Sequence, residues 1–137
     1  MTYAGDLTPL EAWRLLEQDP EALLVDVRSE AEWAFVGMPD TTPLGRKLVT
    51  VAWSHWPGGA RNESFVEDLR ELGVDGSAPT LFICRSGARS RAAAAAATDA
   101  GIAPSYNVAA GFEGDLDEAG HRGRGGWRAA GLPWRQS

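Results

Sequence analysis

Short apolar runs alternate along the chain with segments in which apolar residues recur every three or four positions. The runs are of the length and residue type found in buried strands, and they lie at 23–27, 48–53, 80–83 and 105–108. The segments with helical spacing begin at Pro9, span 62–72 and 87–100, and recur briefly near 114–117 and 126–130. Strands that alternate with helices in this way predict a parallel sheet covered by helices on both faces.

Local signals mark several helix ends. Thr8 directly before Pro9 predicts an N-cap followed by proline at the first helical position. Ser29 with Glu32 three residues later predicts the capping box of a short helix. Gly73 is expected to end the helix over 62–72, whose apolar face is predicted to comprise Phe65, Val66, Leu69 and Leu72.

Composition limits the size and class of the protein. The chain has 137 residues, of which 44% are hydrophobic and 23% charged, as expected for one globular domain with a core from about residue 6 to 134. No apolar run approaches the length of a membrane span, and the first residues lack a secretory leader pattern. The one cysteine, Cys84, cannot form an intramolecular disulfide. A lone thiol survives best in a reducing compartment, so we expect a cytoplasmic protein.

The net charge of −6 argues against nucleic acid or an anionic membrane as a partner. Against this acidic background, the only thiol lies in a locally basic window. Arg85, Arg89 and Arg91 follow Cys84 with no acidic residue between them. The charge pattern therefore points to a small anionic ligand near the cysteine.

Cys84 directly follows the predicted strand at 80–83, and ligands of parallel sheets bind beyond the carboxyl ends of the strands. A tight loop from Cys84 into the next helix would direct backbone N–H groups at the sulfur and favour its thiolate form. Gly87 supplies the positive φ that such a loop often needs. Arginines at a helix start oppose the helix dipole, so a bound sulfonate or phosphate would resolve the conflict at Arg89.

These motifs together resemble the rhodanese family of sulfurtransferases over nearly the whole chain. The cysteine loop, the segment Leu24-Val25-Asp26-Val27-Arg28 with Glu32-Trp33, and the closing segment with Gly111-Phe112 and Gly126-Trp127 carry the resemblance. It implies a three-layer α/β fold with a central five-stranded parallel sheet. It also implies that Arg28 pairs with the acid at position 32. The histidine that commonly follows the first motif is absent, because Met38-Pro39 follows Gly37 here.

The resemblance assigns roles to the loop. Cys84 would be the nucleophile that carries a persulfide, and the substrate would be held by Arg85, Ser86, Gly87, Ala88 and Arg89. The donor would be thiosulfate or a similar anion, and the acceptor cyanide, a thiol or a sulfur-accepting partner protein. The reaction needs neither a metal nor an organic cofactor.

Two other functions stay open. Cysteine phosphatases and arsenate reductases of this scaffold use a Cys-x5-Arg loop, whereas here the arginine comes one position earlier, at Arg89. A persulfide carrier without turnover would use the same cysteine. Neither histidine, His55 or His121, adjoins Cys84 in sequence, although the loop around His55 could wall a pocket.

Overall fold

The structure is a computed structural model that describes residues 3–55, 59–114, 118–121 and 125–136. Its centre is a sheet of five strands in the order β1–β6–β5–β2–β4, and every neighbouring pair is parallel. In chain order the strands are β1 (Gly5–Leu7), β2 (Leu23–Asp26), β4 (Val49–Thr50), β5 (Thr80–Ile83) and β6 (Ser105–Val108). A separate antiparallel pair joins β3 (Met38–Pro39) to β7 (Trp134–Arg135). The predicted α/β fold with five parallel strands is confirmed.

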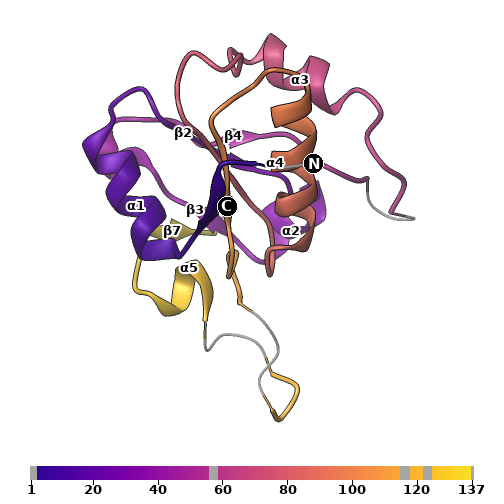
Figure 1. The fold of residues 1–137 in the computed structure, drawn as a ribbon. Helices are drawn as coiled ribbons and strands as arrows, with labels where there is room; N and C mark the ends of the chain where they lie inside the picture. Colours follow the sequence, from indigo (N-terminus) through magenta and orange to yellow (C-terminus); the bar gives the residue numbers. More distant parts are fainter. Residues whose placement is uncertain (1–2, 56–58, 115–117, 122–124, 137) are drawn as a thin grey trace.

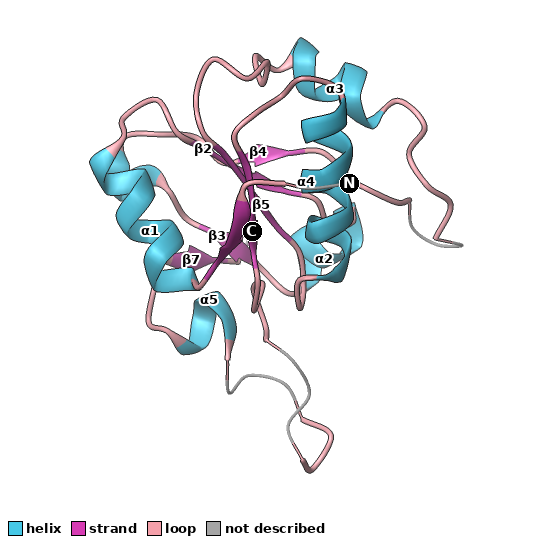
Figure 2. Ribbon diagram, viewed as in Figure 1, coloured by secondary structure: helices cyan, strands magenta, loops and turns pink. Residues whose placement is uncertain are grey.

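Helices cover both faces of this sheet, as Figures 1 and 2 show. One face carries α1 (Pro9–Gln18) and α5 (Gly126–Ala129), and the other carries α3 (Phe65–Glu71) and α4 (Ala88–Asp99). The short helix α2 (Glu30–Phe35) follows β2, and a 3-10 turn, η1 (Thr42–Leu44), follows β3. Because β2 and β5 are parallel neighbours, the helices that follow them, α2 and α4, both begin beyond the carboxyl ends of the strands.

Each face of the sheet has its own core. On the α4 side, Ala93, Ala94 and Ala97 are fully buried, since their small side chains let the helix lie close to the strands. On the α1 side, the core includes Trp127, which is fully buried. Three leucines that are at most 2% exposed pack in the same cluster: Leu16, Leu24 and Leu81.

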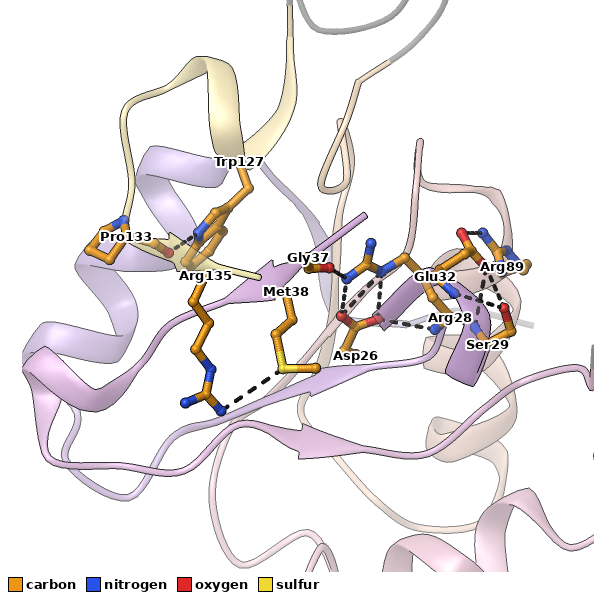
Figure 3. Close-up of polar contacts among 10 residues, drawn as sticks. All are labelled: Asp26, Arg28, Ser29, Glu32, Gly37, Met38, Arg89, Trp127, Pro133 and Arg135. Atoms are coloured by element: carbon orange, nitrogen blue, oxygen red, sulfur yellow. Dashed lines mark hydrogen bonds and ion pairs between the residues drawn. The ribbon is translucent and has the colours of Figure 1, made fainter. Parts of the chain in front are cut away.

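The C-terminal segment is fastened to the body of the domain through its tryptophans. The indole N–H of Trp127 donates to the carbonyl of Pro133 at 2.7 Å, a contact drawn in Figure 3. The Trp127 ring also meets Trp13 of α1 edge-on, with centroids 5.7 Å apart. Trp127 of α5 and Leu132 beyond it therefore belong to the core on the α1 side, whereas Trp134 is exposed.

Most local signals are confirmed, and the errors lie at element ends. Thr8 and Ser29 both cap their helices in capping boxes. The strand predicted over 48–53 is only Val49–Thr50, and the helix predicted over 62–72 begins at Phe65. Leu72 is 56% exposed, so its place on the apolar face was wrong. Of the helix expected near 114–117, Gly114 is not helical and 115–117 lie outside the described residues.

Candidate active site

The cysteine loop connects the carboxyl end of β5 to the first turn of α4. Cys84 is 1% exposed. Its Sγ accepts a hydrogen bond from the backbone N–H of Gly87 at 3.1 Å and lies 3.2 Å from Ser90 Oγ. Gly87 has a φ of 113°, as the predicted positive φ requires. The loop thus directs one backbone N–H at the sulfur from the helix start.

Two glycines allow the segment that follows β6 to lie in close backbone contact with this loop. A Cβ on Gly87 would overlap the carbonyl of Ala109, and one on Gly111 would overlap the backbone of Arg85. The N–H of Phe112 donates to the carbonyl of Cys84 at 2.8 Å. The segment after β6 therefore helps to hold the backbone of the cysteine loop in position.

A buried ion pair supports the site from β2. Arg28 and Asp26 have fully buried side chains, and the guanidinium donates to both carboxylate oxygens, with Nη2 at 2.7 Å from Oδ2. The same Nη2 donates to the carbonyl of Gly37 at 2.6 Å (Figure 3). The guanidinium carbon lies 4.5 Å from the ring centroid of Phe112. The pair links β2, the end of α2 and the segment behind the cysteine loop.

The expected partner of Arg28 was wrong. Glu32 instead forms a two-pronged ion pair with Arg89 of the cysteine loop, with oxygen–nitrogen distances of 2.6 and 2.9 Å (Figure 3). Asp26 is two residues from Arg28 and accepts from its Nε and Nη2, whereas Glu32 lies on α2 beside the loop. A carboxylate of the protein itself thus offsets the charge of Arg89 at the helix start, a role the sequence had assigned to a bound anion.

The carboxyl group of Glu32, which lines the cavity, has an unusually low pKa. Burial acts to raise the pKa of Glu32, but hydrogen bonds from Arg89 and Ser29 outweigh it and lower the pKa to about 2. The carboxylate is therefore charged at all ordinary pH values, and Arg89 stays tied to α2.

Glu32→Gln should lower the free energy of unfolding by about 1–2 kcal/mol at pH 7, allowing for solvent screening of a half-buried group. Because the folded pKa is depressed, the stabilisation is complete above the unfolded pKa of 4.5 and is lost as pH falls towards 2. Urea unfolding of the variant and the wild type between pH 7 and 2.5 measures this difference. A gap that stays constant down to pH 2.5 would contradict the assigned ion pair.

A cavity of about 740 Å³ opens beside the loop. Arg85 and Arg89 line it from the loop, Phe35 from α2, and His55 from the segment before the undescribed residues 56–58. Phe35 is 81% exposed, which is unusual for a phenylalanine. The guanidinium of Arg85 is exposed and has no ion pair among the described residues, so it is available to an anionic ligand.

The predicted site residues lie in different surroundings. Gly87 donates its backbone N–H to the sulfur of Cys84. Arg85 and Arg89 both line the cavity, but Arg89 also donates to the carboxylate of Glu32. Ser86 is half-buried and Ala88 is exposed within the same loop. His55 does wall the cavity, and His121 is exposed.

Sequence reasoning missed two polar residues behind the sulfur. Ser90 and Asn107 are both fully buried, and the hydroxyl of Ser90 lies 2.5 Å from Asn107 Oδ1. The available signal was a polar residue, Asn107, within the short predicted strand at 105–108. Buried amides need partners, so its presence there already pointed to a polar network.

Comparison with known proteins identifies the class. The chain matches the rhodanese-like domain over residues 8–118, and it belongs to that family. A crystal structure of Rv0390 from M. tuberculosis shares 55% sequence identity and a TM-score of 0.91, covering 99% of this chain and 100% of that one. RC0915, an uncharacterized protein of Rickettsia conorii, is 32% identical over 91% of this chain and 92% of its own length.

A more distant structure shares the fold. RPA3614 from Rhodopseudomonas palustris, described as a possible tyrosine phosphatase, has 24% identity and a TM-score of 0.56, covering 96% of this chain and 84% of that one.

Among the described residues, no helix has the length and apolar character needed to span a bilayer. Within the same residues, no group of three or more histidine, cysteine or acidic side chains is placed to hold a metal ion.

Proposed function

We propose that this protein is a sulfurtransferase that carries sulfane sulfur on Cys84. The observation that carries the proposal is the placement of the only cysteine at the end of β5, with a loop N–H on its sulfur. Beside the loop lies a cavity to which Arg85, Arg89 and two glutamates contribute. Parallel sheets bind ligands at this end of their strands, and membership of the rhodanese-like family adds to the same interpretation.

The reaction is a double displacement through a covalent intermediate. The Cys84 thiolate attacks the outer sulfur of thiosulfate, the sulfur–sulfur bond breaks, and sulfite leaves with the bonding electrons. The outer sulfur stays as an anionic persulfide near the start of α4. Cyanide or a thiol then attacks that sulfur and leaves as thiocyanate or a persulfide, which regenerates the Cys84 thiolate. Charge stays negative throughout, and the N–H of Gly87 and the guanidinium of Arg85 are the groups placed to stabilise it.

Arg85 is proposed to bind the anionic donor, because its guanidinium has no carboxylate partner among the described residues whereas Arg89 is held by Glu32. Arg85→Ala should reduce kcat/KM for thiosulfate about ten- to a hundredfold, the effect of losing one charge-assisted hydrogen bond. Steady-state formation of thiocyanate from thiosulfate and cyanide measures it. Arg14→Ala, which removes an exposed arginine of α1 on the other face of the sheet, is the matched control. Equal effects of the two substitutions would exclude Arg85 as the donor site.

A persulfide carrier is the second candidate, and the exposure of Phe35 beside the loop favours it. A phenylalanine that is 81% exposed at the cavity suits contact with a partner protein. The same assay separates the two functions, since a carrier loads once and turns over poorly with cyanide. A phosphatase is disfavoured by the short Cys-x4-Arg loop, and the absence of hydrolysis of a phosphate ester would exclude it.

A further inference from the structure

A chain of hydrogen bonds leads from the cysteine to the surface. Cys84 Sγ lies 3.2 Å from Ser90 Oγ, and Ser90 Oγ lies 2.5 Å from Asn107 Oδ1. The amide of Asn107 donates from Nδ2 to Asp6 Oδ1 at 2.9 Å, and the hydroxyl of Tyr3 donates to the same oxygen at 2.8 Å. The register of β1 against β6 sets Asp6 directly beside Asn107.

The exposed end of this chain sets the direction of every bond in it. The carboxylate of Asp6 can only accept, because hydrogen bonds from Asn107 and Tyr3 lower its pKa and keep it ionised. Asn107 must therefore turn its NH₂ group towards Asp6 and its oxygen towards Ser90. That oxygen also only accepts, so the single hydroxyl proton of Ser90 is committed to Asn107.

This leaves the oxygen of Ser90 as an acceptor facing the sulfur. A protonated Cys84 satisfies it by donating its S–H. A thiolate does not, since the hydroxyl of Ser90 would have to turn to the sulfur and leave the buried oxygen of Asn107 without a donor. A persulfide has no charge or proton on its inner sulfur, so it leaves the bond from Ser90 to Asn107 in place.

We infer that Asp6, Asn107 and Ser90 form a positioning chain that keeps the hydroxyl proton of Ser90 on Asn107. The chain thereby opposes the N–H of Gly87, which favours the thiolate of Cys84. Asp6 orients Asn107, Asn107 orients Ser90, and Ser90 faces the thiol. The chain disfavours the free thiolate relative to both the thiol and the persulfide. Resting on the proposed function, this retains transferred sulfur on Cys84, because unloading must pass through the disfavoured thiolate.

The inference is tested by the pH dependence of Cys84 alkylation with iodoacetamide, followed by intact mass. Asn107→Val removes the acceptor and frees the hydroxyl of Ser90 for the sulfur, without changing any charge. The pH midpoint of alkylation should fall by about one unit, the effect of one hydrogen bond to a charged group. The charged groups around the loop stay the same in this variant: Asp6, Asp26, Arg28, Glu32, Arg85, Arg89 and Arg91.

A second background separates this chain from a general effect of the substitution. In Ser90→Ala the link is broken, so adding Asn107→Val should leave the midpoint where Ser90→Ala alone puts it. The inference is wrong if Asn107→Val does not shift the midpoint, or if it shifts it equally with and without Ser90.

Asp6→Leu gives an independent test at an exposed position, because leucine cannot accept from the amide of Asn107. It removes the acceptor that orients Asn107, so the midpoint should fall in the wild-type background and stay unchanged in Ser90→Ala. Asp75→Leu, which replaces an exposed carboxylate that accepts from the backbone of Ser77, is the charge-matched control and should have no effect. If the midpoint falls equally in the Ser90→Ala background, the cause is the loss of charge alone, and the inferred hydrogen-bond chain is wrong. Alkylation needs no sulfur donor, so failure of the chain and failure of sulfur transfer are told apart.

Discussion

Cys84→Ser should abolish sulfur transfer from thiosulfate to cyanide, by more than about a thousandfold, because the only nucleophilic sulfur of the chain is lost. The fold should survive, since a serine hydroxyl can still accept from the N–H of Gly87 and bond to Ser90. Thiocyanate formation measures the loss, and thermal unfolding checks that the variant is folded.

The matched control is Ser64→Ala, which removes an exposed hydroxyl at the start of α3 and leaves the sulfur and its N–H donor in place. It should retain most of the activity. Substantial turnover in Cys84→Ser would show that another group performs the chemistry, and the assignment of Cys84 would be wrong.

Arg28→Met should lower the free energy of unfolding by about 3–5 kcal/mol, the usual result of removing one partner of a buried ion pair. The variant leaves Asp26 buried without its counter-ion and removes the hydrogen bond to Gly37. It also removes the guanidinium that lies against Phe112, behind the cysteine loop. Urea unfolding at pH 7 measures the change.

Two further variants show whether the buried charge causes the loss. Arg14→Met, at an exposed position of α1, should change stability by no more than about 0.5 kcal/mol. Asp26→Leu combined with Arg28→Met should be less unstable than Arg28→Met alone, because no uncompensated charge remains. A double variant that is less stable than the single one would mean that packing, not charge, dominates at this site.

The parts of the fold that depend on neighbours in sequence were predictable. The capping boxes at Thr8 and Ser29 need only residues within one helical turn, and the buried strand at 80–83 is a continuous apolar run. The strands β1, β3 and β7 were not predicted, because they are two or three residues long and carry no apolar alternation. Their pairing is decided by partners far away in sequence.

The same distinction holds at the site. The position of Cys84 followed from the strand before it and the helix after it. The bond between Glu32 and Arg89 did not, since it joins residues 57 positions apart through the placement of α2 beside α4. The chain through Asn107 depends on the strand order, which sets β6 between β5 and β1 and brings a surface carboxylate within two hydrogen bonds of Ser90.

The central claim is that Cys84 accepts and releases one sulfur atom, and intact-mass measurement after incubation with thiosulfate tests it most directly. The account predicts that the wild-type chain gains the mass of one sulfur atom, that cyanide removes it, and that Cys84→Ser gains nothing. A wild-type chain whose mass is unchanged by thiosulfate and by organic persulfides, or a reversible gain that persists in Cys84→Ser, would contradict it.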